Sequence, residues 1–287
     1  MREVKAVIGT AGFGSRFFPY TAAVGKAMLP IGNRPVVDYL VQELAAAGVR
    51  EIAFVVQPGD DQIRRYFEEN ARTKRYFEER GWTDKYAPVA RLHADLAQVR
   101  FTWIEQPQDG RYGSAMPGLA ASGFIGDADW FLLSGDDVVL RADGGSDLRD
   151  MRLARHRAGA AAAIQVTEVS RARARSYGMV RLRREAGWDA LAGMVEKPQP
   201  GQEPTLLANI SRYLLGPELL DRFARLRPDP HSGEYQTPTA ILDIATDHPV
   251  LVHRIAGEYH DCGTPDSWLE ANLAMRRMTD PHSKADQ

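Results

Sequence analysis

The stretch that decides the fold is Val4-Lys-Ala-Val-Ile-Gly-Thr-Ala-Gly-Phe-Gly-Ser-Arg16, near the start of the chain. Its first residues, Val4–Ile8, predict a short apolar strand, and a loop with three glycines follows directly. Such a loop lets backbone N–H groups approach a phosphate. It lacks the G-x-G-x-x-G dinucleotide pattern, and Arg16 follows Ser15 where a Walker A loop has Lys and then Ser or Thr. The stretch therefore indicates a phosphate-binding loop outside the P-loop class, in preference to a plain strand-to-helix turn.

The residues beyond this loop complete a parallel βαβ unit. Apolar residues at helical spacing predict a helix over Pro35–Ala47, with Gly48 as its C-terminal cap, and Glu51–Val56 as the next strand. Further strands are predicted at Arg100–Glu105, Trp130–Ser134, Ala161–Val166, Met179–Leu182, Leu206–Leu214 and Val250–Ile255. Helical segments fall between most of them. We therefore expect an α/β protein, a Rossmann-like three-layer sandwich with a mostly parallel mixed central sheet.

Composition limits the classes of partner. The 287 residues carry a net charge of −2, so no overall positive field attracts nucleic acid or an anionic membrane. The only cysteine, Cys262, excludes an internal disulfide and suits a reducing compartment. No apolar run approaches the ~20 residues of a membrane span, and the N-terminus reads as a strand and not as a signal peptide. We expect a cytoplasmic protein with a single domain over residues 1–279 and a polar, disordered tail over residues 280–287.

A charged segment interrupts the α/β pattern. Arg64-Arg-Tyr-Phe-Glu-Glu69 nearly recurs as Lys74-Arg-Tyr-Phe-Glu-Glu79, a spacing too short for a solenoid repeat. Alternating charges at this spacing are typical of solvated helices with i,i+4 ion pairs. The segment predicts a charged helical insertion over residues 61–92, either a helical hairpin or one long surface helix.

Three motifs near the N-terminus, taken together, resemble a known enzyme superfamily. Gly9-x-x-Gly-x-Gly-Ser-Arg16, Phe18-Pro19-x-Thr21 and Lys26-x-Met28-Leu-Pro30 resemble the pattern of the sugar-phosphate nucleotidyltransferases. Within it, the chain is most similar to the bacterial UTP–glucose-1-phosphate uridylyltransferases, over nearly its whole length and including the charged insertion. Later matches, in the family's order, are Glu105-Gln106, Gly113-Ser114-Ala115, Gly135-Asp-Asp-Val138, Tyr177-Gly178, Glu196-Lys-Pro198, Gly233-Glu-x-Gln236 and His260-Asp-Cys-Gly263.

The resemblance implies transfer of a nucleotidyl group, most simply UMP from UTP, to a sugar 1-phosphate, most simply glucose 1-phosphate. The attacking phosphate monoester is already ionised near pH 7, so no general base is required. The difficulty is that two polyanions must meet, which calls for positioning and charge neutralisation. Arg16 can spread charge over the triphosphate, and Lys26 can place a point charge at the α-phosphate. On its own, Lys26 would read as an ordinary surface lysine.

The resemblance also assigns the remaining site residues. The nucleotide would be bound by Ala11, Gly12, Gly14, Gln106, Gly113 and Asp136. The sugar phosphate would be bound by Asp137, Tyr177, Gly178, Glu196 and Lys197. Asp136 and Asp261 would hold Mg²⁺. Neighbouring strand residues point to opposite faces, so Glu196 and Lys197 can reach one ligand only if the strand ends there, which Pro198 favours.

Several positions depart from the uridylyltransferase pattern and leave the substrates open. Ala22 and Ala27 stand where Lys and Glu are usual, Thr237-Pro238-Thr239 where Leu-Thr-Asp is typical, and Asn209 where an aliphatic residue is common. The same chemistry on dTTP, GTP or ATP, or on a modified sugar or cyclitol phosphate, is the alternative. A third is an inactive homologue that only binds nucleotide, which the intact charged residues disfavour. We also expect a homodimer or homotetramer.

Overall fold

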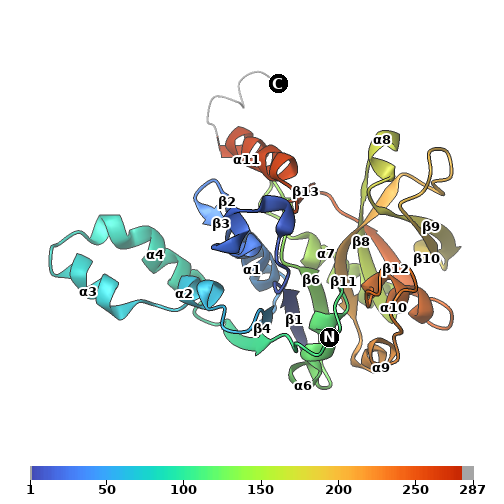
Figure 1. The fold of residues 1–287 in the computed structure, drawn as a ribbon, viewed down its shortest axis with the longest axis horizontal. Coiled ribbons are helices and arrows are strands. Elements are labelled where there is room, and N and C mark those ends of the chain that lie inside the picture. The colour runs from blue at the N-terminus through green and yellow to red at the C-terminus, as the bar shows by residue number, and fades with distance from the viewer. Residues whose placement is uncertain (1, 280–287) are drawn as a thin grey trace.

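The computed structural model describes residues 2–279, and the tail expected over residues 280–287 lies outside them. The described residues form one main sheet of nine strands with helices around it (Figure 1). Its strands are β1 (Val4–Gly9), β4 (Glu51–Val56), β5 (Arg100–Glu105), β6 (Asp129–Ser134), β8 (Ala162–Glu168), β9 (Gly178–Glu185), β10 (Trp188–Glu196), β11 (Leu207–Leu215) and β12 (Val250–Arg254). Their order across the sheet is β5-β4-β1-β6-β11-β8-β12-β10-β9.

The main sheet is mixed. Strands β5, β4, β1 and β6 are mutually parallel, and β8 is parallel to β12. Strand β11 lies between these two groups and is antiparallel to both, and β10 is antiparallel to β12 and to β9. Among the described strands of this sheet, only β10 and β11 therefore run against the common direction.

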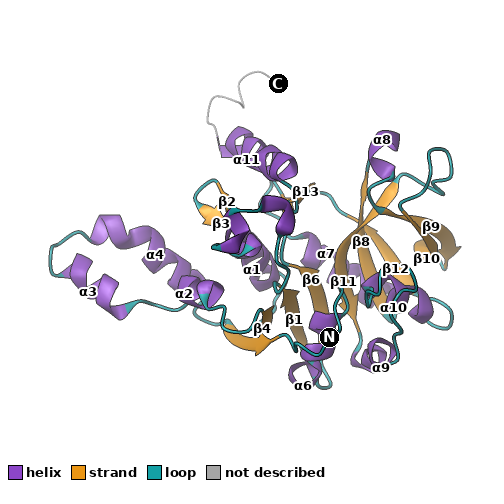
Figure 2. Cartoon of the chain, viewed as in Figure 1, coloured by secondary structure: helices purple, strands orange, loops and turns teal. Residues whose placement is uncertain are grey.

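Helices cover both faces of the sheet (Figure 2). The α-helices are α1 (Val36–Ala46), α2 (Gln62–Phe67), α3 (Ala71–Glu78), α4 (Thr83–Asp95), α5 (Met116–Ala120), α6 (Ser122–Ile125), α7 (Asp147–Ala158), α8 (Arg171–Ala174), α9 (Leu220–Ala224), α10 (Thr237–Ile244) and α11 (Pro265–Thr279). Ala6 and Ile8 of β1 pack in a core with α1 and α7, whereas Val7 packs in a second core with α9 and α10. This alternation follows from the two-residue period of a strand.

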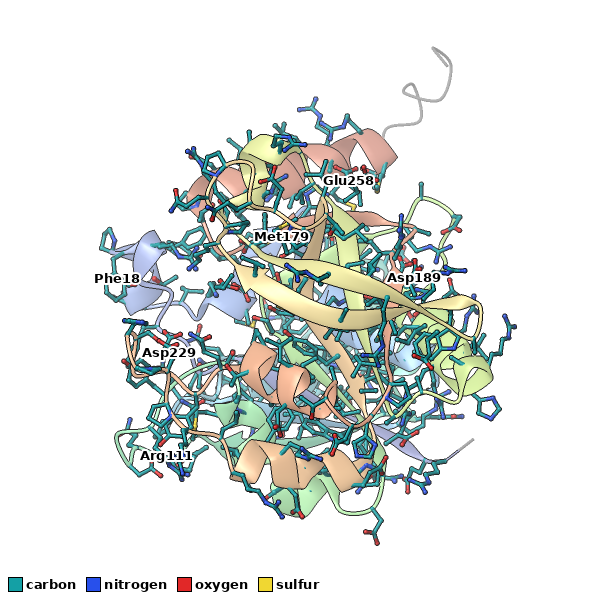
Figure 3. The ribbon with its side chains drawn as sticks, turned by 90° about the vertical axis from the view of Figure 1, so that its right-hand side faces the viewer. Phe18, Arg111, Met179, Asp189, Asp229 and Glu258 are labelled. Atoms are coloured by element: carbon teal, nitrogen blue, oxygen red, sulfur yellow. The ribbon has the colours of Figure 1, made fainter. Side chains whose placement is uncertain are left out.

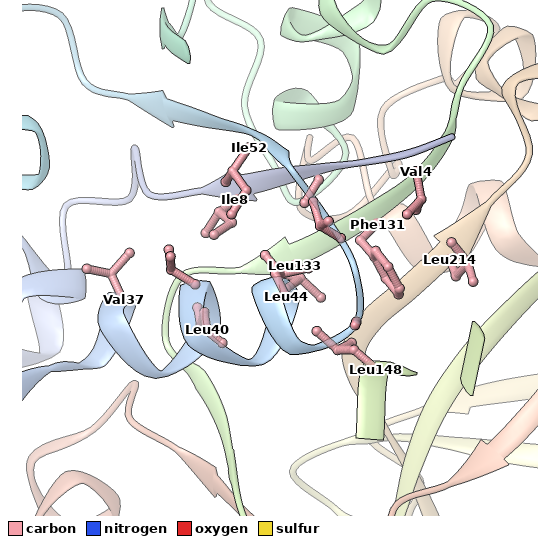
Figure 4. Close-up of a cluster of buried hydrophobic side chains, with 14 of the residues drawn as sticks. Val4, Ile8, Val37, Leu40, Leu44, Ile52, Phe131, Leu133, Leu148 and Leu214 are labelled. Carbon is pink, nitrogen blue, oxygen red and sulfur yellow. The ribbon is translucent and has the colours of Figure 1, made fainter. Parts of the chain in front are cut away.

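The predicted βαβ unit is confirmed. Helix α1 presents Val37, Leu40 and Leu44 to the sheet, where they meet Ile8 and Ile52 (Figure 4). Strands β1 and β4 pair in parallel, as a crossover through one helix requires. Gly48, beyond the helix, has φ +86° and donates to the Ala45 carbonyl at 3.0 Å, so a glycine ends α1 as expected.

The charged insertion is a helical hairpin that projects from the sheet (Figure 1). The two near-repeats fall on different helices, the first on α2 and the second on α3, and the hairpin continues through α4 to Asp95. Phe67 of α2 is buried and stacks on Phe101 at 4.8 Å between ring centroids. In the outer part, Phe77 contacts Tyr86 at 5.8 Å. The long single helix is therefore wrong, because the two copies of the repeat have different packing partners.

Five strands of the described residues were not predicted from the sequence. Strand β10 forms an antiparallel hairpin with β9. The hairpin faces the viewer in Figure 3, where Met179 of β9 and Asp189 of β10 are labelled. Its run of Ala, Gly and Met lacks the β-branched residues that mark a strand. Strands β7 (Asp137–Leu140) and β13 (Glu258–Asp261) form a separate two-stranded antiparallel sheet. Another small ribbon pairs β2 (Pro30–Ile31) with β3 (Arg34–Pro35).

The C-terminal helix α11 packs its buried Ala271 and Ala274 toward the small β7–β13 sheet region, in a core with Val138 and Cys262. Its Leu269 and Leu273 are exposed.

Across residues 2–279, no helix is both long enough and apolar enough to cross a membrane.

A buried ion pair joins strand β11 of the main sheet to helices α1 and α7. Arg212 of β11 is fully buried, and one of its Nη atoms donates to Glu43 of α1. The other carboxylate oxygen of Glu43 accepts from the backbone N–H of Leu148 in α7 at 3.1 Å. One carboxylate thus connects α1, α7 and β11.

We expect Glu43→Ala to lower the free energy of unfolding by about 3–5 kcal/mol, because it leaves a buried guanidinium without its counter-charge. Asp221→Ala is the matched control, since Asp221 pairs with Arg225 in the open, with both side chains at least 78% exposed. That change should cost less than about 0.5 kcal/mol. Urea unfolding of both variants measures the difference, and equal effects would show that the Arg212–Glu43 pair is not a structural centre.

Candidate active site

A cavity of about 470 Å³ lies at the carboxyl ends of β1 and β6. Parallel sheets collect ligands at this edge. The lining residues are Gly9, Thr10, Ala11, Gly12, Phe13, Lys26, Ala27, Gln106, Tyr112, Gly113, Ser114, Pro117, Leu132, Leu133, Ser134, Gly135, Asp136, Ser211, Tyr213 and Thr237. Six of the predicted nucleotide or catalytic residues are therefore on one cavity, Ala11, Gly12, Lys26, Gln106, Gly113 and Asp136.

The glycine-rich loop is held between two strands. At its start, the N–H of Thr10 donates to Val55 at 2.9 Å, and the N–H of Gly135 donates to Gly9 at 3.0 Å. Gly12 is exposed, and a Cβ built on it would meet no atom within 4 Å. Gly14 does not line the cavity and instead turns the chain, with φ +62° and its carbonyl bound by Thr21 at 2.7 Å. The open backbone for a ligand is thus at Gly12.

Lys26 and Asp136 form an ion pair inside the cavity. Lys26 begins a short 3₁₀ helix, Lys26–Met28, and its ammonium contacts Asp136 Oδ2. Burial disfavours the Lys26 ammonium, but attraction and a hydrogen bond to Asp136 outweigh burial and raise its pKa. Burial also disfavours the Asp136 carboxylate, yet Lys26, the Ser134 hydroxyl and Arg16 together lower its pKa. With a side chain only 20% exposed, Lys26 is not an ordinary surface lysine.

Two further carboxylates crowd this pair. Strand β13 pairs with β7 so that Asp261 lies opposite Asp137. Burial, and then the charge of Asp136, raises the pKa of the Asp261 carboxyl. The pKa of Asp137 is raised well above its usual range by burial and by the charges of Asp136 and Asp261. Asp137 also accepts a hydrogen bond from the Tyr259 hydroxyl and does not line the cavity.

A small space beside Gly263 brings the charged groups together. A Cβ built on Gly263 would lie 2.6 Å from Asp261 Oδ1, 3.1 Å from Asp136 Oδ2 and 3.4 Å from Arg16 Nη2. The absence of a side chain at Gly263 therefore leaves room between two carboxylates and a guanidinium. Arg16 itself is exposed, on the 3₁₀ helix Ser15–Phe17.

The carboxylates of Asp136 and Asp261 suit a hard divalent cation such as Mg²⁺. Within residues 2–279, no group of three or more His, Cys, Asp or Glu side chains is placed to hold a metal ion. Mg²⁺ commonly takes only one or two carboxylates and completes its shell with water and substrate phosphates. The donor set therefore fits a cation that arrives with a phosphate ligand.

Gln106 and Gly113 both line the cavity. Gln106 follows β5, and its backbone N–H donates to Val56 at 2.9 Å, so the backbone pairing of the sheet continues to this residue. Gly113 has φ +124°, and a Cβ there would lie 2.5 Å from the carbonyl oxygen of Tyr235. Glycine is thus required at 113 by packing against the chain itself, in addition to any approach by a base.

Four of the five predicted sugar residues, Tyr177, Gly178, Glu196 and Lys197, gather at the base of the β9–β10 hairpin, and none of the five lines the cavity. Glu196 pairs with Gly178, where a Cβ would lie 2.8 Å from Glu196 Oε2. Strand β10 ends at Glu196, and Lys197 adopts φ +45°. Lys197 Nζ consequently lies 3.9 Å from Glu196 Oε1, so both side chains reach the same side, as expected. The N–H of Lys197 donates to Tyr177 at 3.0 Å.

A pair of tyrosines links this group to the carboxylates. The ring of Tyr177 lies 6.3 Å from that of Tyr259, whose hydroxyl donates to Asp137. Burial raises the pKa of the Glu196 carboxyl, and the nearby charge of Lys197 lowers it. Burial has the larger effect, so the pKa is raised overall. Asp137 is thus connected to the hairpin residues through Tyr259 and Tyr177. A direct contact between Asp137 and the sugar phosphate stays a prediction.

Sequence reasoning missed Tyr213, Ser211, Thr237 and Tyr112, all of which line the cavity. They come from β11, α10 and the loop after β5. No local motif marks Tyr213, which reaches this edge because β11 lies beside β6, whereas Thr237 begins α10 directly after the Gly233-Glu-x-Gln236 motif.

A cation–carboxylate pair and a glycine-rich loop at the carboxyl edge of an α/β sheet define an enzyme that handles nucleotide phosphates. The chain belongs to the nucleotidyl transferase family, whose model matches residues 5–277.

The relatives agree with this family and with the predicted resemblance. A UTP–glucose-1-phosphate uridylyltransferase from Pseudomonas aeruginosa is 29% identical over 269 residues, 93% of this chain and 94% of its own. Another from Mycoplasma pneumoniae is 30% identical over 288 residues, 98% of this chain and 94% of its own. The structure of a UDP-glucose pyrophosphorylase complexed with UDP-glucose matches with a TM-score of 0.84 at 25% identity, over 96% of this chain and 99% of that one. A UTP-bound enzyme from Acinetobacter baumannii matches with a TM-score of 0.86 at 26% identity, over 99% and 96%.

Two glycines of the cavity should respond differently to alanine. Gly12→Ala should leave the free energy of unfolding within about 0.5 kcal/mol of wild type, because the added Cβ meets nothing. It should weaken nucleoside triphosphate binding at least about tenfold by blocking backbone donors. Gly113→Ala should cost about 1–3 kcal/mol of stability through its φ and its clash with Tyr235. Thermal melts and nucleotide titrations test both, and unweakened binding by Gly12→Ala would remove the loop from the phosphate site.

Proposed function

We propose that this protein transfers UMP from UTP to glucose 1-phosphate, giving UDP-glucose and pyrophosphate by in-line displacement at the α-phosphorus. One observation carries the proposal. A single cavity joins the open backbone at Gly12, the amide of Gln106 and the Lys26–Asp136 pair. These are the groups needed to bind a triphosphate, read a base edge and neutralise charge at the reacting phosphorus.

The choice of UTP and glucose rests on the relatives and on Gln106. Both curated relatives are named for UTP and glucose 1-phosphate, and the two solved structures hold UDP-glucose and UTP. A glutamine amide offers one acceptor and a donor pair, which complements the edge of uracil. Gln106 lines the cavity beside Gly113, in keeping with such a contact.

The reaction needs positioning and charge more than proton transfer. The Lys26 ammonium, raised in pKa by Asp136, keeps its charge and can neutralise the α-phosphate. Arg16, whose guanidinium lies at the space beside Gly263, can bind the departing phosphates in a bidentate way. Bound Mg²⁺, held by Asp136 and Asp261, would supply further neutralisation of phosphate charge.

The sugar phosphate is assigned to the base of the β9–β10 hairpin. Glu196 can accept hydrogen bonds from sugar hydroxyls, and Lys197 can pair with the phosphate, since both reach the same side. Tyr177 and Gly178 would border the ring, and Asp137 would lie behind it. We further propose that the enzyme works in the cytoplasm as a homodimer or homotetramer.

The polar side chains of Asn209 and Thr237 favour the second candidate, the same transfer to a different sugar or cyclitol phosphate. Both are buried and more polar than the residues usual in the uridylyltransferases. A third candidate, an inactive nucleotide-binding homologue, predicts no turnover.

The deciding experiment is a matrix of UTP, dTTP, GTP and ATP against sugar 1-phosphates, read by pyrophosphate release. UTP with glucose 1-phosphate should give the highest kcat/KM. Faster turnover of another pair would favour the second candidate. Nucleotide binding without any turnover would favour the third.

Metal removal should abolish the reaction. Activity should vanish in excess EDTA and return on addition of Mg²⁺, because two polyanions cannot meet without a cation. Asp136→Asn should lose most activity while remaining folded. Full turnover in excess chelator would contradict the metal requirement, and a wild-type rate for Asp136→Asn would place the metal site elsewhere.

Lys26→Ala should lower kcat on the order of 10²–10³-fold, by analogy with the loss of one preorganised donor. Lys26→Arg should restore little, because a planar fork does not replace a compact ammonium. Lys74→Ala is the matched control, since Lys74 pairs with Glu69 at an exposed site and should change nothing. The measurement is kcat at saturating substrates, with a melt on each variant. Turnover within a few-fold of wild type would leave Lys26 only a structural partner of Asp136.

Glu196→Ala should weaken sugar-phosphate use without changing triphosphate binding. The lost hydrogen bond to a charged group corresponds to about 1.5–3 kcal/mol in kcat/KM for the sugar phosphate. Initial rates with each substrate varied in turn separate the two effects. An equal loss for both substrates would mean that Glu196 only supports the hairpin.

A further inference from the structure

Strand β11 is irregular where it borders the cavity. Asn209 pairs with Val166 of β8, and Tyr213 pairs with Ile164, so four steps along β11 match two along β8. The bulge contains Ser211, which has φ +56°, a left-handed conformation that residues with a Cβ disfavour. Bulges re-aim side chains next to active sites. Here the bulge turns a cluster of polar side chains toward one place.

Asn209 and Tyr213 meet across this bulge. Asn209 Nδ2 donates to the Tyr213 hydroxyl at 2.7 Å, and the two residues are only 7% and 2% exposed. Tyr213 and Ser211 both line the cavity. Burial raises the pKa of the Tyr213 phenol, so the hydroxyl keeps its proton at neutral pH. This hydroxyl accepts from Asn209 and also interacts with the Ser211 side chain, so the three polar side chains form one cluster.

Two buried oxygens at this place have no hydrogen-bond partner within residues 2–279. They are Oδ1 of Asn209 and Oγ1 of Thr237, a residue that is 1% exposed and lines the same cavity. Turning the Asn209 amide would only exchange which end is unpaired. Buried polar groups are almost always satisfied, so the unpaired oxygen of Thr237 on the cavity lining is one that a ligand hydroxyl or a water can satisfy, and that of Asn209 lies next to the lining residue Tyr213.

The electrostatic surroundings place this cluster between the two halves of the site. The charges of Asp137 and Glu196 both act on the Tyr213 hydroxyl. On the other side, the backbone N–H of Thr237 donates to Ser114 at 2.9 Å, next to Gly113. A sugar joined to the nucleotide would therefore pass over the cluster.

We propose that Asn209, Ser211, Tyr213 and Thr237 form a polar floor that binds ring hydroxyls of the sugar, and that Asn209 selects among sugar 1-phosphates. The proposal rests on the proposed function. Tyr213 offers a donor, and Asn209 and Thr237 offer groups that a bound hydroxyl would satisfy. An aliphatic residue at 209 would remove both the unpaired amide group and the partner that orients Tyr213.

The test compares glucose 1-phosphate with its monodeoxy analogues in wild-type enzyme, Asn209→Leu and Tyr213→Phe, with Mg²⁺ and the preferred triphosphate. In the wild type, removing the hydroxyl that the floor reads should lower kcat/KM about 3- to 10-fold. In both variants the same removal should have almost no effect, and KM for the triphosphate should not change. Should Asn209→Leu fail to fold, Tyr213→Phe, which lacks one hydroxyl, gives the same comparison.

Gln165→Leu is the matched control, because Gln165 of β8 is also a buried amide without a partner among the described residues, but lies off the cavity. It should keep the wild-type response to every analogue. The proposal is overturned if Asn209→Leu and Tyr213→Phe retain the full wild-type penalty for each deoxy sugar while remaining active. Absence of pyrophosphate release from every substrate pair, by contrast, would refute the proposed function itself, and this inference with it.

Discussion

The structure is organised around negative charge that is buried at the end of β6. Asp136, Asp137 and Asp261 are close enough to affect one another's ionisation, and the first two are buried while Asp261 is half-buried. Such a group is tolerable only when cations face it. Lys26 provides one within the protein, and its contact with Asp136 ties the segment after the glycine-rich loop to the sheet edge. Because the carboxylates of this site outnumber the cations that face them, the site is suited to a ligand that binds together with a cation.

This constraint explains the small β7–β13 sheet, which the main sheet does not need for its own core. Its register places Asp261 opposite Asp137, and the N–H of Cys262 donates to the Asp136 carbonyl at 2.9 Å. Two segments far apart in the sequence are thereby fixed to within a side chain's reach. Gly263 then keeps the space between the carboxylates open. The β7–β13 sheet therefore positions the second carboxylate, that of Asp261, beside the first.

Sequence alone predicted two of the parallel strands to the residue, since β4 and β5 begin and end where expected. Strand β4 is a buried, nearly continuous apolar run, whereas β5 is a partly exposed strand at the sheet edge. The sequence did not reveal β10, which is rich in Ala and Gly. Nor did it distinguish a helical hairpin from one long helix in the insertion. Tertiary contacts decide both features. Local motifs marked Gly12, Lys26 and Asp136. Tyr213 was missed, since only the order of strands brings it to the cavity, and Thr237 was noted as a departure from the family pattern but not assigned to the site.

The antiparallel direction of β11 has a consequence for the site. Parallel strands offer only their carboxyl ends to the cavity edge, whereas β11 enters at that edge with its first half. Its bulge therefore lies beside the ligand, where an ordinary strand would have continued the regular ladder. A non-glycine residue in the left-handed region, such as Ser211, costs on the order of 1–3 kcal/mol. The unpaired oxygens of Asn209 and Thr237 add to this cost in folding stability on the same side of the cavity. Unpaired buried groups also occur elsewhere among the described residues, as at Gln165 and His253, but in β11 an unpaired amide oxygen and a left-handed residue lie only two residues apart beside the cavity.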